Sequence, residues 1–179
     1  MRIKKIIKGK GNEIVVGNNT IITDSEIRIV GNNNRIVFGE NIHVGKNCSF
    51  WMEGNGISIM IGSGTTFVTN IHLCAQEDGT IIKIGKDCML SNTIIIRTSD
   101  SHPIYQNGKR INSPQNVFIG DRVWIAPNSK VFKGATIGNG CIIGSDTLAN
   151  KSYPANSLIV GHPGKVIKSD VVWTREKLF

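Results

Sequence analysis

Hydrophobic positions recur every six residues in the second half of the chain, at Ile119, Ile125, Val131, Ile137 and Ile143. The repeats read IGDRVW, IAPNSK, VFKGAT, IGNGCI and IGSDTL: the first residue is aliphatic, the second mostly small, the fifth small or β-branched. A six-residue period fits neither the helical period of 3.6 nor the strand alternation of two. It predicts a parallel β-helix of short strands and tight corners, in which three strands complete a coil of about 18 residues.

A looser, Asn-rich version of the pattern extends through the first half, so we expect one mainly-β domain over residues 1–179. Asn residues at successive corners are expected to stack as amide ladders. Roughly seven to eight coils are predicted once the segment without repeats is removed. The expected parts are N-terminal coils, a loop excursion, C-terminal coils and a short helix or tail on the last coil, over residues 12–96, 97–117, 118–166 and 167–179.

Composition supports this interpretation. The 20 glycines suit corners, and an aromatic content of 6% suits a narrow interior filled by Ile and Val. No apolar run is long enough for a transmembrane helix, and the apolar part of MRIKKIIKGKG is too short for a signal peptide. We therefore expect no transmembrane segment and a cytoplasmic location.

Cysteine placement and charge narrow the chemistry further. Cys48, Cys88 and Cys141 stand at the fifth position of a repeat, as small buried residues would, and the four cysteines form no C-x-x-C pair. This favours reduced thiols over a disulfide framework. The net charge of +8 comes from scattered Lys and Arg residues without interleaved aromatics, so we expect an anionic cofactor or acidic glycan as partner and no nucleic acid.

Residues 84–173 resemble the hexapeptide-repeat acyltransferases, in particular the maltose/galactoside acetyltransferase branch and its capsule and O-antigen O-acetyltransferase relatives. The strings that carry the likeness are IRTSDSHPIY, GKRIN, the run from VFIGDRVW to GHPGKVI, and VVW. The resemblance implies a left-handed β-helix, a homotrimer with active sites between subunits, acetyl-CoA as donor and a sugar hydroxyl as acceptor. The handedness follows from the resemblance alone.

His102, in the excursion, matches the catalytic histidine of these enzymes. The resemblance implies that it acts as general base, for which imidazole is suited near neutral pH. Asp100 lies two residues earlier, on the same side of an extended segment. It is expected either to orient His102 or to stabilise a turn.

Four further residues are acceptor-binding candidates. Asn70 and His72 fall near the Asn with which these enzymes contact the acceptor or the oxyanion, and the alignment leaves open which of the two serves. Arg97 and Arg110 flank the excursion, where they would bind an acidic acceptor or close the loop by ion pairing.

The resemblance also implies a site for the cofactor. Trp124 would form an aromatic wall near the pantetheine arm, and the backbone at Ala126 and Ser145 would bond its amides. Lysines would meet the phosphates as flexible point charges. These expected cofactor-binding residues are Trp124, Ala126, Ser145, Lys151, Lys165 and Lys168.

The interpretation is an acetyl-CoA-dependent O-acetyltransferase acting on a bacterial envelope polysaccharide or its precursor. The main alternative is an N-acetyltransferase of a nucleotide-linked amino sugar, although no G-x-G-x-x-G motif follows a strand. A γ-class carbonic anhydrase would need converging histidines, which the wide spacing of the four His residues disfavours; we expect no metal site. An ice-binding solenoid would need a regular Thr array, which is missing from the sequence.

Overall fold

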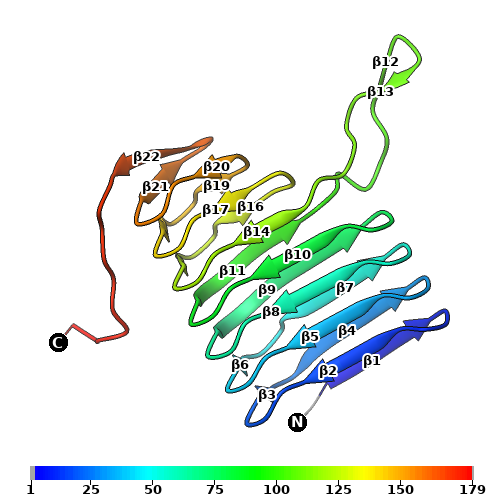
Figure 1. Cartoon of the computed structure of the whole chain (residues 1–179), viewed down its shortest axis with the longest axis horizontal. Helices are drawn as coiled ribbons and strands as arrows, with labels where there is room; N and C mark the ends of the chain where they lie inside the picture. The colour runs from blue at the N-terminus through cyan, green and yellow to red at the C-terminus, as the bar shows by residue number, and fades with distance from the viewer. Residues whose placement is uncertain (1–2, 179) are drawn as a thin grey trace.

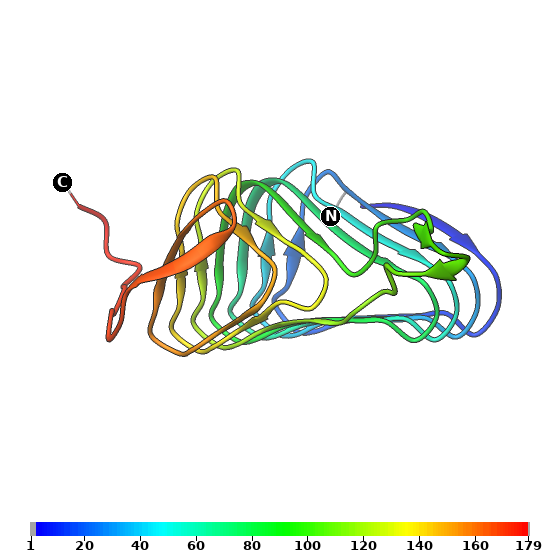
Figure 2. The same cartoon turned by 90° about the horizontal axis from the view of Figure 1, so that it is seen from above.

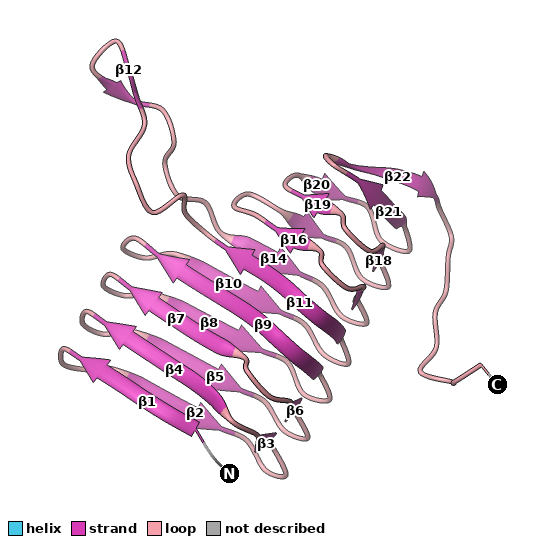
Figure 3. Ribbon diagram, turned by 180° about the vertical axis from the view of Figure 1, so that it is seen from behind, coloured by secondary structure: helices cyan, strands magenta, loops and turns pink. Residues whose placement is uncertain are grey.

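The computed structural model describes residues 3–178, which form a parallel β-helix with three sheet faces (Figure 1). The ends of the predicted domain, at residues 1, 2 and 179, lie outside the described residues. Each face contains seven stacked strands, so the helix has seven coils. Within residues 3–178 there is no helix, and so none that could cross a membrane (Figure 3).

Face one is the seven-stranded sheet β2 (Glu13–Val16), β5 (Arg35–Phe38), β8 (Ser58–Ile61), β10 (Ile81–Ile84), β14 (Val117–Ile119), β17 (Thr136–Ile137) and β20 (Ser152–Tyr153). Face two contains β3 (Ile21–Ile22), β6 (His43–Val44), the first parts of β9 (Thr66–Gln76) and β11 (Met89–Arg97), then β15 (Trp124–Ile125), β18 (Ile142–Ile143) and β21 (Leu158–Gly161). Face three contains β1 (Ile3–Lys8), β4 (Ser25–Val30), β7 (Ser49–Glu53), the second parts of β9 and β11, then β16 (Lys130–Val131) and β19 (Leu148–Ala149).

The coils have two sizes. In the C-terminal half Trp124 pairs with Ile142 on the next coil, so three hexapeptides complete one coil, as the repeats predict. The N-terminal coils are wider: Glu26 pairs with Ser49, and Ser49 with His72, a sequence separation of 23. The predicted coil of three hexapeptides is therefore correct for the C-terminal coils and wrong for the N-terminal ones, whose strands are longer on faces one and three.

The core follows this difference in width. The three largest fully buried side chains, Phe38, Phe50 and Phe67, lie in the wide coils, with ring centroids of neighbours 5.0 and 5.9 Å apart. The narrow coils fill the interior with smaller residues such as Val131 and Ala149, both fully buried. Fully buried aliphatic and aromatic side chains supply the main stabilisation of such a stack.

Polar side chains bond one coil to the next at the corner between faces three and one. Asn34 is fully buried, donates to the Gly54 carbonyl (2.9 Å) and accepts from the Ile57 amide (2.8 Å). The Asn32 and Asn55 side chains accept backbone N–H bonds in the same way, each from the coil below. The predicted amide ladders are therefore confirmed.

The cysteines occupy the interior positions that the repeats assign to them. Cys48, Cys88 and Cys141 are free and buried, so the prediction of small, buried, unpaired thiols is confirmed. Burial raises the pKa of the Cys88 thiol to about 11, which keeps it protonated near neutral pH.

The C-terminal segment differs from the short helix, or tail on the last coil, that the sequence led us to expect. The chain reverses at Pro163 into β22 (Gly164–Lys168), antiparallel to β21, and then runs extended back across earlier coils (Figure 1). Trp173 is buried and donates its indole N–H to the Arg122 carbonyl (2.8 Å), and Arg175 bonds to Asp87 (3.0 Å). These bonds on earlier coils hold the segment along the side of the stack.

Candidate active site

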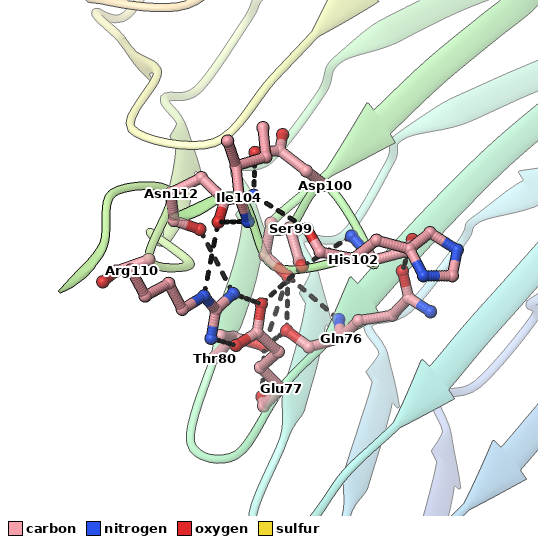
Figure 4. Close-up of polar contacts among 12 residues, drawn as sticks. Gln76, Glu77, Thr80, Ser99, Asp100, His102, Ile104, Arg110 and Asn112 are labelled. Carbon is pink, nitrogen blue, oxygen red and sulfur yellow. Dashed lines mark hydrogen bonds and ion pairs between the residues drawn. The ribbon is translucent and has the colours of Figure 1, made fainter. Parts of the chain in front are cut away.

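The excursion leaves the solenoid between β11 and β14 and ends in a small antiparallel hairpin, β12 (Tyr105–Gln106) and β13 (Lys109–Arg110). It projects from the corner between faces three and one, on the side opposite the C-terminal segment (Figures 1 and 2). The rim of the excursion, meaning the part that meets the wide coils, contains the cluster of polar side chains shown in Figure 4.

Glu77 ties the excursion to the solenoid. Its carboxylate accepts two bonds from the Arg110 guanidinium (2.6 and 2.8 Å) and one from the Ser99 hydroxyl (2.6 Å). The bonds from Arg110 keep the pKa of Glu77 below its ordinary value. Of the two roles expected for Arg110, closing the loop by ion pairing is the one that this geometry shows.

His102 is solvent-exposed at this rim. Its backbone carbonyl accepts from the Asn112 side chain (2.8 Å), which fixes the chain at this point while the imidazole remains accessible. An open cavity of about 720 Å³ lies against it, lined by Trp51, Glu53, Gly54, Gln76, Glu77, Asp78, Ser101 and His102. The imidazole can therefore reach a molecule that occupies this cavity.

Asp100 does not contact His102. Its carboxylate accepts from the Lys133 ammonium (2.5 Å) and the Asn112 amide (2.9 Å), and the bond from Lys133 lowers the pKa of Asp100. Figure 4 shows the His102 imidazole on the other side of the chain from this carboxylate. Within one chain, the Asp100 carboxylate therefore stabilises the loop and does not orient the His102 imidazole.

The acceptor candidates on β9 and β11 lie on or beside the outer surface of face three. His72 bonds to the Ser49 hydroxyl through Nδ1, and its ring centroid is 6.0 Å from that of Trp51. Burial, with a smaller contribution from Arg97, lowers the pKa of His72 and so favours neutral imidazole. Asn70 is an exposed corner residue with φ 54°, a backbone conformation that Asn tolerates, which gives this position a structural reason for its Asn.

Face two of the narrow coils places part of the expected cofactor set on one line. Trp124 pairs with Ile142, Ile142 with Leu158, and Leu158 with Lys168 on β22. Lys165 lies on the same pair of strands. An aromatic ring, half-buried aliphatic side chains and two lysines therefore follow one another, which suits a pantetheine arm that ends in phosphates.

The other expected cofactor residues lie apart from this line. Lys151 is at a corner between faces three and one, 5.8 Å from the Tyr153 ring. The Ala126 backbone N–H donates a hydrogen bond to the Ile143 carbonyl (2.8 Å). Ser145 is exposed at a corner beside face two.

Sequence reasoning missed the residues at and beside the cavity beneath His102, above all Trp51, Ser49 and Gln76. The signal that would have found them is the longer step of the wide coils: Trp51 lies one such step below Cys74, and Cys74 one below Arg97. Lys133, the partner of Asp100, carries no comparable signal, because it is brought close only by the return of the excursion.

The fold and the site define a β-helical transferase, and comparison with known proteins agrees. Residues 116–148 match the family model "Bacterial transferase hexapeptide (six repeats)". The chain is 38% identical to a polysialic acid O-acetyltransferase of Neisseria meningitidis, over 94% of this chain and 78% of the relative. It is 29% identical to the putative lipopolysaccharide biosynthesis O-acetyl transferase WbbJ of Escherichia coli K12, over 78% of this chain and 74% of that protein.

The fold matches the crystal structure of the polysialic acid O-acetyltransferase OatWY with a TM-score of 0.81 at 31% identity, covering 97% of this chain and 92% of that one. The chain belongs to the hexapeptide-repeat acetyltransferases. It is an acyltransferase with a left-handed parallel β-helix, and the family, fold and enzyme class predicted from the sequence are confirmed.

Proposed function

We propose that this enzyme transfers the acetyl group of acetyl-CoA to a sugar hydroxyl of a bacterial envelope polysaccharide or its precursor, with His102 as general base. The observation that carries the proposal is the exposed His102 imidazole beside an open cavity on the wide coils. The names of the relatives, which act on polysialic acid or in lipopolysaccharide biosynthesis, support the class of acceptor.

In the proposed reaction, His102 removes the proton of the acceptor hydroxyl while its oxygen bonds to the thioester carbonyl carbon. The carbon–sulfur bond breaks, and the departing CoA sulfur takes the proton from the imidazolium. The products are an acetyl ester and the free thiol of CoA. Because a thioester is already activated, positioning of base and acceptor suffices without a covalent enzyme intermediate.

The donor is proposed to bind along the line from Trp124 to Lys168 on face two. Trp124 would wall off the reactive end, and Lys165 and Lys168 would meet the phosphates. Reduced, buried cysteines agree with a cytoplasmic reaction.

A homotrimer is part of the proposal. His102 lies at the corner between faces three and one, whereas Trp124 is on face two of the same chain. A complete site therefore needs His102 of one subunit and face two of a neighbour, which a closed cyclic oligomer provides.

The test is release of free thiol from acetyl-CoA by wild type, His102→Ala and the control His43→Ala, which removes another exposed histidine. We expect His102→Ala to lower turnover by about 100- to 10,000-fold, with unchanged CoA binding by calorimetry and near-normal turnover for His43→Ala. Normal turnover of His102→Ala would overturn the proposal. Release only with a nucleotide-linked amino sugar would establish N-acetyl transfer instead.

A further inference from the structure

Three buried side-chain N–H groups within residues 3–178 have no hydrogen-bond partner: Arg28 Nε, Trp51 Nε1 and Arg97 Nε. All three residues belong to one row across the outer surface of face three. Arg28 pairs with Trp51, Trp51 with Cys74, and Cys74 with Arg97. Buried polar groups in folded proteins almost always have partners. All three groups are donors and lie in one row, so the row needs hydrogen-bond acceptors that residues 3–178 do not supply.

The row also carries two positive charges that form no ion pair within the described part of the chain. Neither Arg28 nor Arg97 forms an ion pair with any acid of residues 3–178. Arg28 lies over the Trp51 ring, with its guanidinium carbon 5.4 Å from the centroid, and Arg97 donates to the Ser101 hydroxyl (2.6 Å). Two arginines thus flank an aromatic ring and retain donors for an anion.

The acids near the row are already bonded to neighbouring side chains. Glu53 accepts from Gln76 (3.0 Å), Glu77 from Arg110, and Asp78 from Asn55. None of these acids forms an ion pair with Arg28 or Arg97, although Glu53 and Asp78 accept from neutral amides and keep their negative charges. An anionic ligand on face three therefore meets two guanidinium groups that have no ion pair among the described residues, whereas the charges of Glu53 and Asp78 lie at the cavity beside the row.

The row is continuous with the candidate active site. Trp51 lines the cavity that His102 also lines, and Ser101, the residue before His102, is bonded to Arg97. A molecule lying along the row would extend from the outer surface of face three to the imidazole.

We propose that the Arg28–Trp51–Arg97 row is an acceptor subsite for an acidic glycan. Arg28 and Arg97 each bind a sugar carboxylate, for which the planar guanidinium is suited, and Trp51 contacts a sugar ring between them. The two arginines are three strands apart, or about 14 Å at the usual strand spacing. One carboxylate cannot reach both, so the subsite takes an oligosaccharide with carboxylates on more than one unit. This inference deepens the proposed function and rests on it.

The experiment uses oligomers of sialic acid and the same oligomers with their carboxyl groups reduced to alcohols. Binding to wild type, Arg28→Met, Arg97→Met and Arg97→Lys is measured by calorimetry without acetyl-CoA, and kcat and KM are measured in the thiol-release assay. Arg35→Met is the matched control, because Arg35 is an exposed arginine on face one that pairs with Glu13 (2.7 Å).

We expect each Met variant to weaken binding of the acidic oligomer, or raise its KM, by about 10- to 100-fold, the loss of a charge-assisted hydrogen bond. The reduced oligomer should bind wild type and variants equally weakly, Arg97→Lys should restore part of the affinity, and Arg35→Met should change nothing. Acidic oligomers that bind without being acetylated, with the same loss in the variants, would support the subsite and count against the proposed function.

Three results would overturn the subsite. One is equal loss on acidic and reduced oligomers. Another is efficient acetylation of neutral glycans only, with no binding of acidic ones, which would leave the proposed function standing. The third is dissociation of the oligomer in Arg28→Met or Arg97→Met, measured by light scattering, because the row would then be bonded to a neighbouring copy.

Discussion

The wide N-terminal coils and the narrow C-terminal coils are built on one plan but present different surfaces. A wide coil takes more residues to close than a narrow one, and the additional residues lengthen the strands of faces one and three. The longer strands of face three give room for an outer surface of polar and aromatic side chains, Trp51 and His72 among them. Face two of the narrow coils instead presents the line from Trp124 to Lys168.

This difference suggests a division of labour between the two halves. The wide coils and the excursion supply the proposed acceptor surface and base, and the narrow coils supply the proposed donor groove. Because the two surfaces lie on different faces of one chain, the division works only if neighbouring subunits bring them together.

Subunit mixing gives the largest expected effect. In the proposed homotrimer, His102→Ala alone and Trp124→Ala alone should each be nearly inactive, since each variant lacks one half of every site. Coexpressed in equal amounts, the two variants should recover about a quarter of the wild-type rate, because one interface in four joins an intact His102 to an intact Trp124. Thiol release by purified mixed oligomers measures this. A mixture as inactive as its parents would mean that both residues act within one subunit.

How far the sequence predicts the molecule also differs between the halves. The hexapeptides of the narrow coils specify both the fold and the coil length, because each contributes one inward aliphatic residue. In the wide coils the same signal is diluted by longer strands, and the longer step shows in recurring glycines such as those at 17, 39, 62 and 85. A Cβ on Gly62 would lie 2.5 Å from the Gly85 carbonyl carbon, so close stacking explains this column.

The site was predictable where a local motif exists and not where packing assembles it. His102 stands in a His-Pro within an evident interruption of the repeat, and the structure leaves it exposed beside a cavity. Asp100 lies only two residues before His102, yet its carboxylate is bonded to Lys133, which is distant in sequence. Trp51 lies under the excursion only because coils stack, a relation that needs the correct coil length. Residues brought together by stacking therefore required the structure.

Side-chain hydrogen bonds at the corners should contribute more to the free energy of unfolding in the wide coils than in the narrow ones. Asn34→Ala would leave the Gly54 carbonyl and the Ile57 amide without partners in a wide coil, at a cost of about 3 kcal/mol. Ser129→Ala in a narrow coil removes one strong bond, to the Gly144 carbonyl (2.8 Å), and should cost about 1 kcal/mol. Urea unfolding followed by circular dichroism at fixed protein concentration compares them. Equal losses would show that the wide coils do not depend on amide ladders.

The smallest expected effect is a loosening of the excursion from the wide coils at low pH. The pKa values of Glu77 and Asp100 are lowered in the folded chain, by hydrogen bonds from Arg110 and Lys133 respectively. A carboxyl whose folded pKa lies below its unfolded value stabilises the fold fully above the unfolded pKa, and this contribution is lost as the pH falls through the folded one. The excursion should therefore loosen below the ordinary carboxyl range, while the apolar core of the coils stays folded.

The chemical shift of the Ile104 amide, which donates to Asn112 within the excursion (2.7 Å), reports this loosening in an NMR titration from neutral pH down through the carboxyl range. In Glu77→Gln the amide should already have its loosened shift at neutral pH and titrate less, because the charge of the Arg110 pair is gone. Amides of the narrow coils, such as that of Val131, serve as the internal reference. If Ile104 and Val131 shift together at one pH, the excursion is not a separate unit and its carboxylates do not hold it independently of the solenoid.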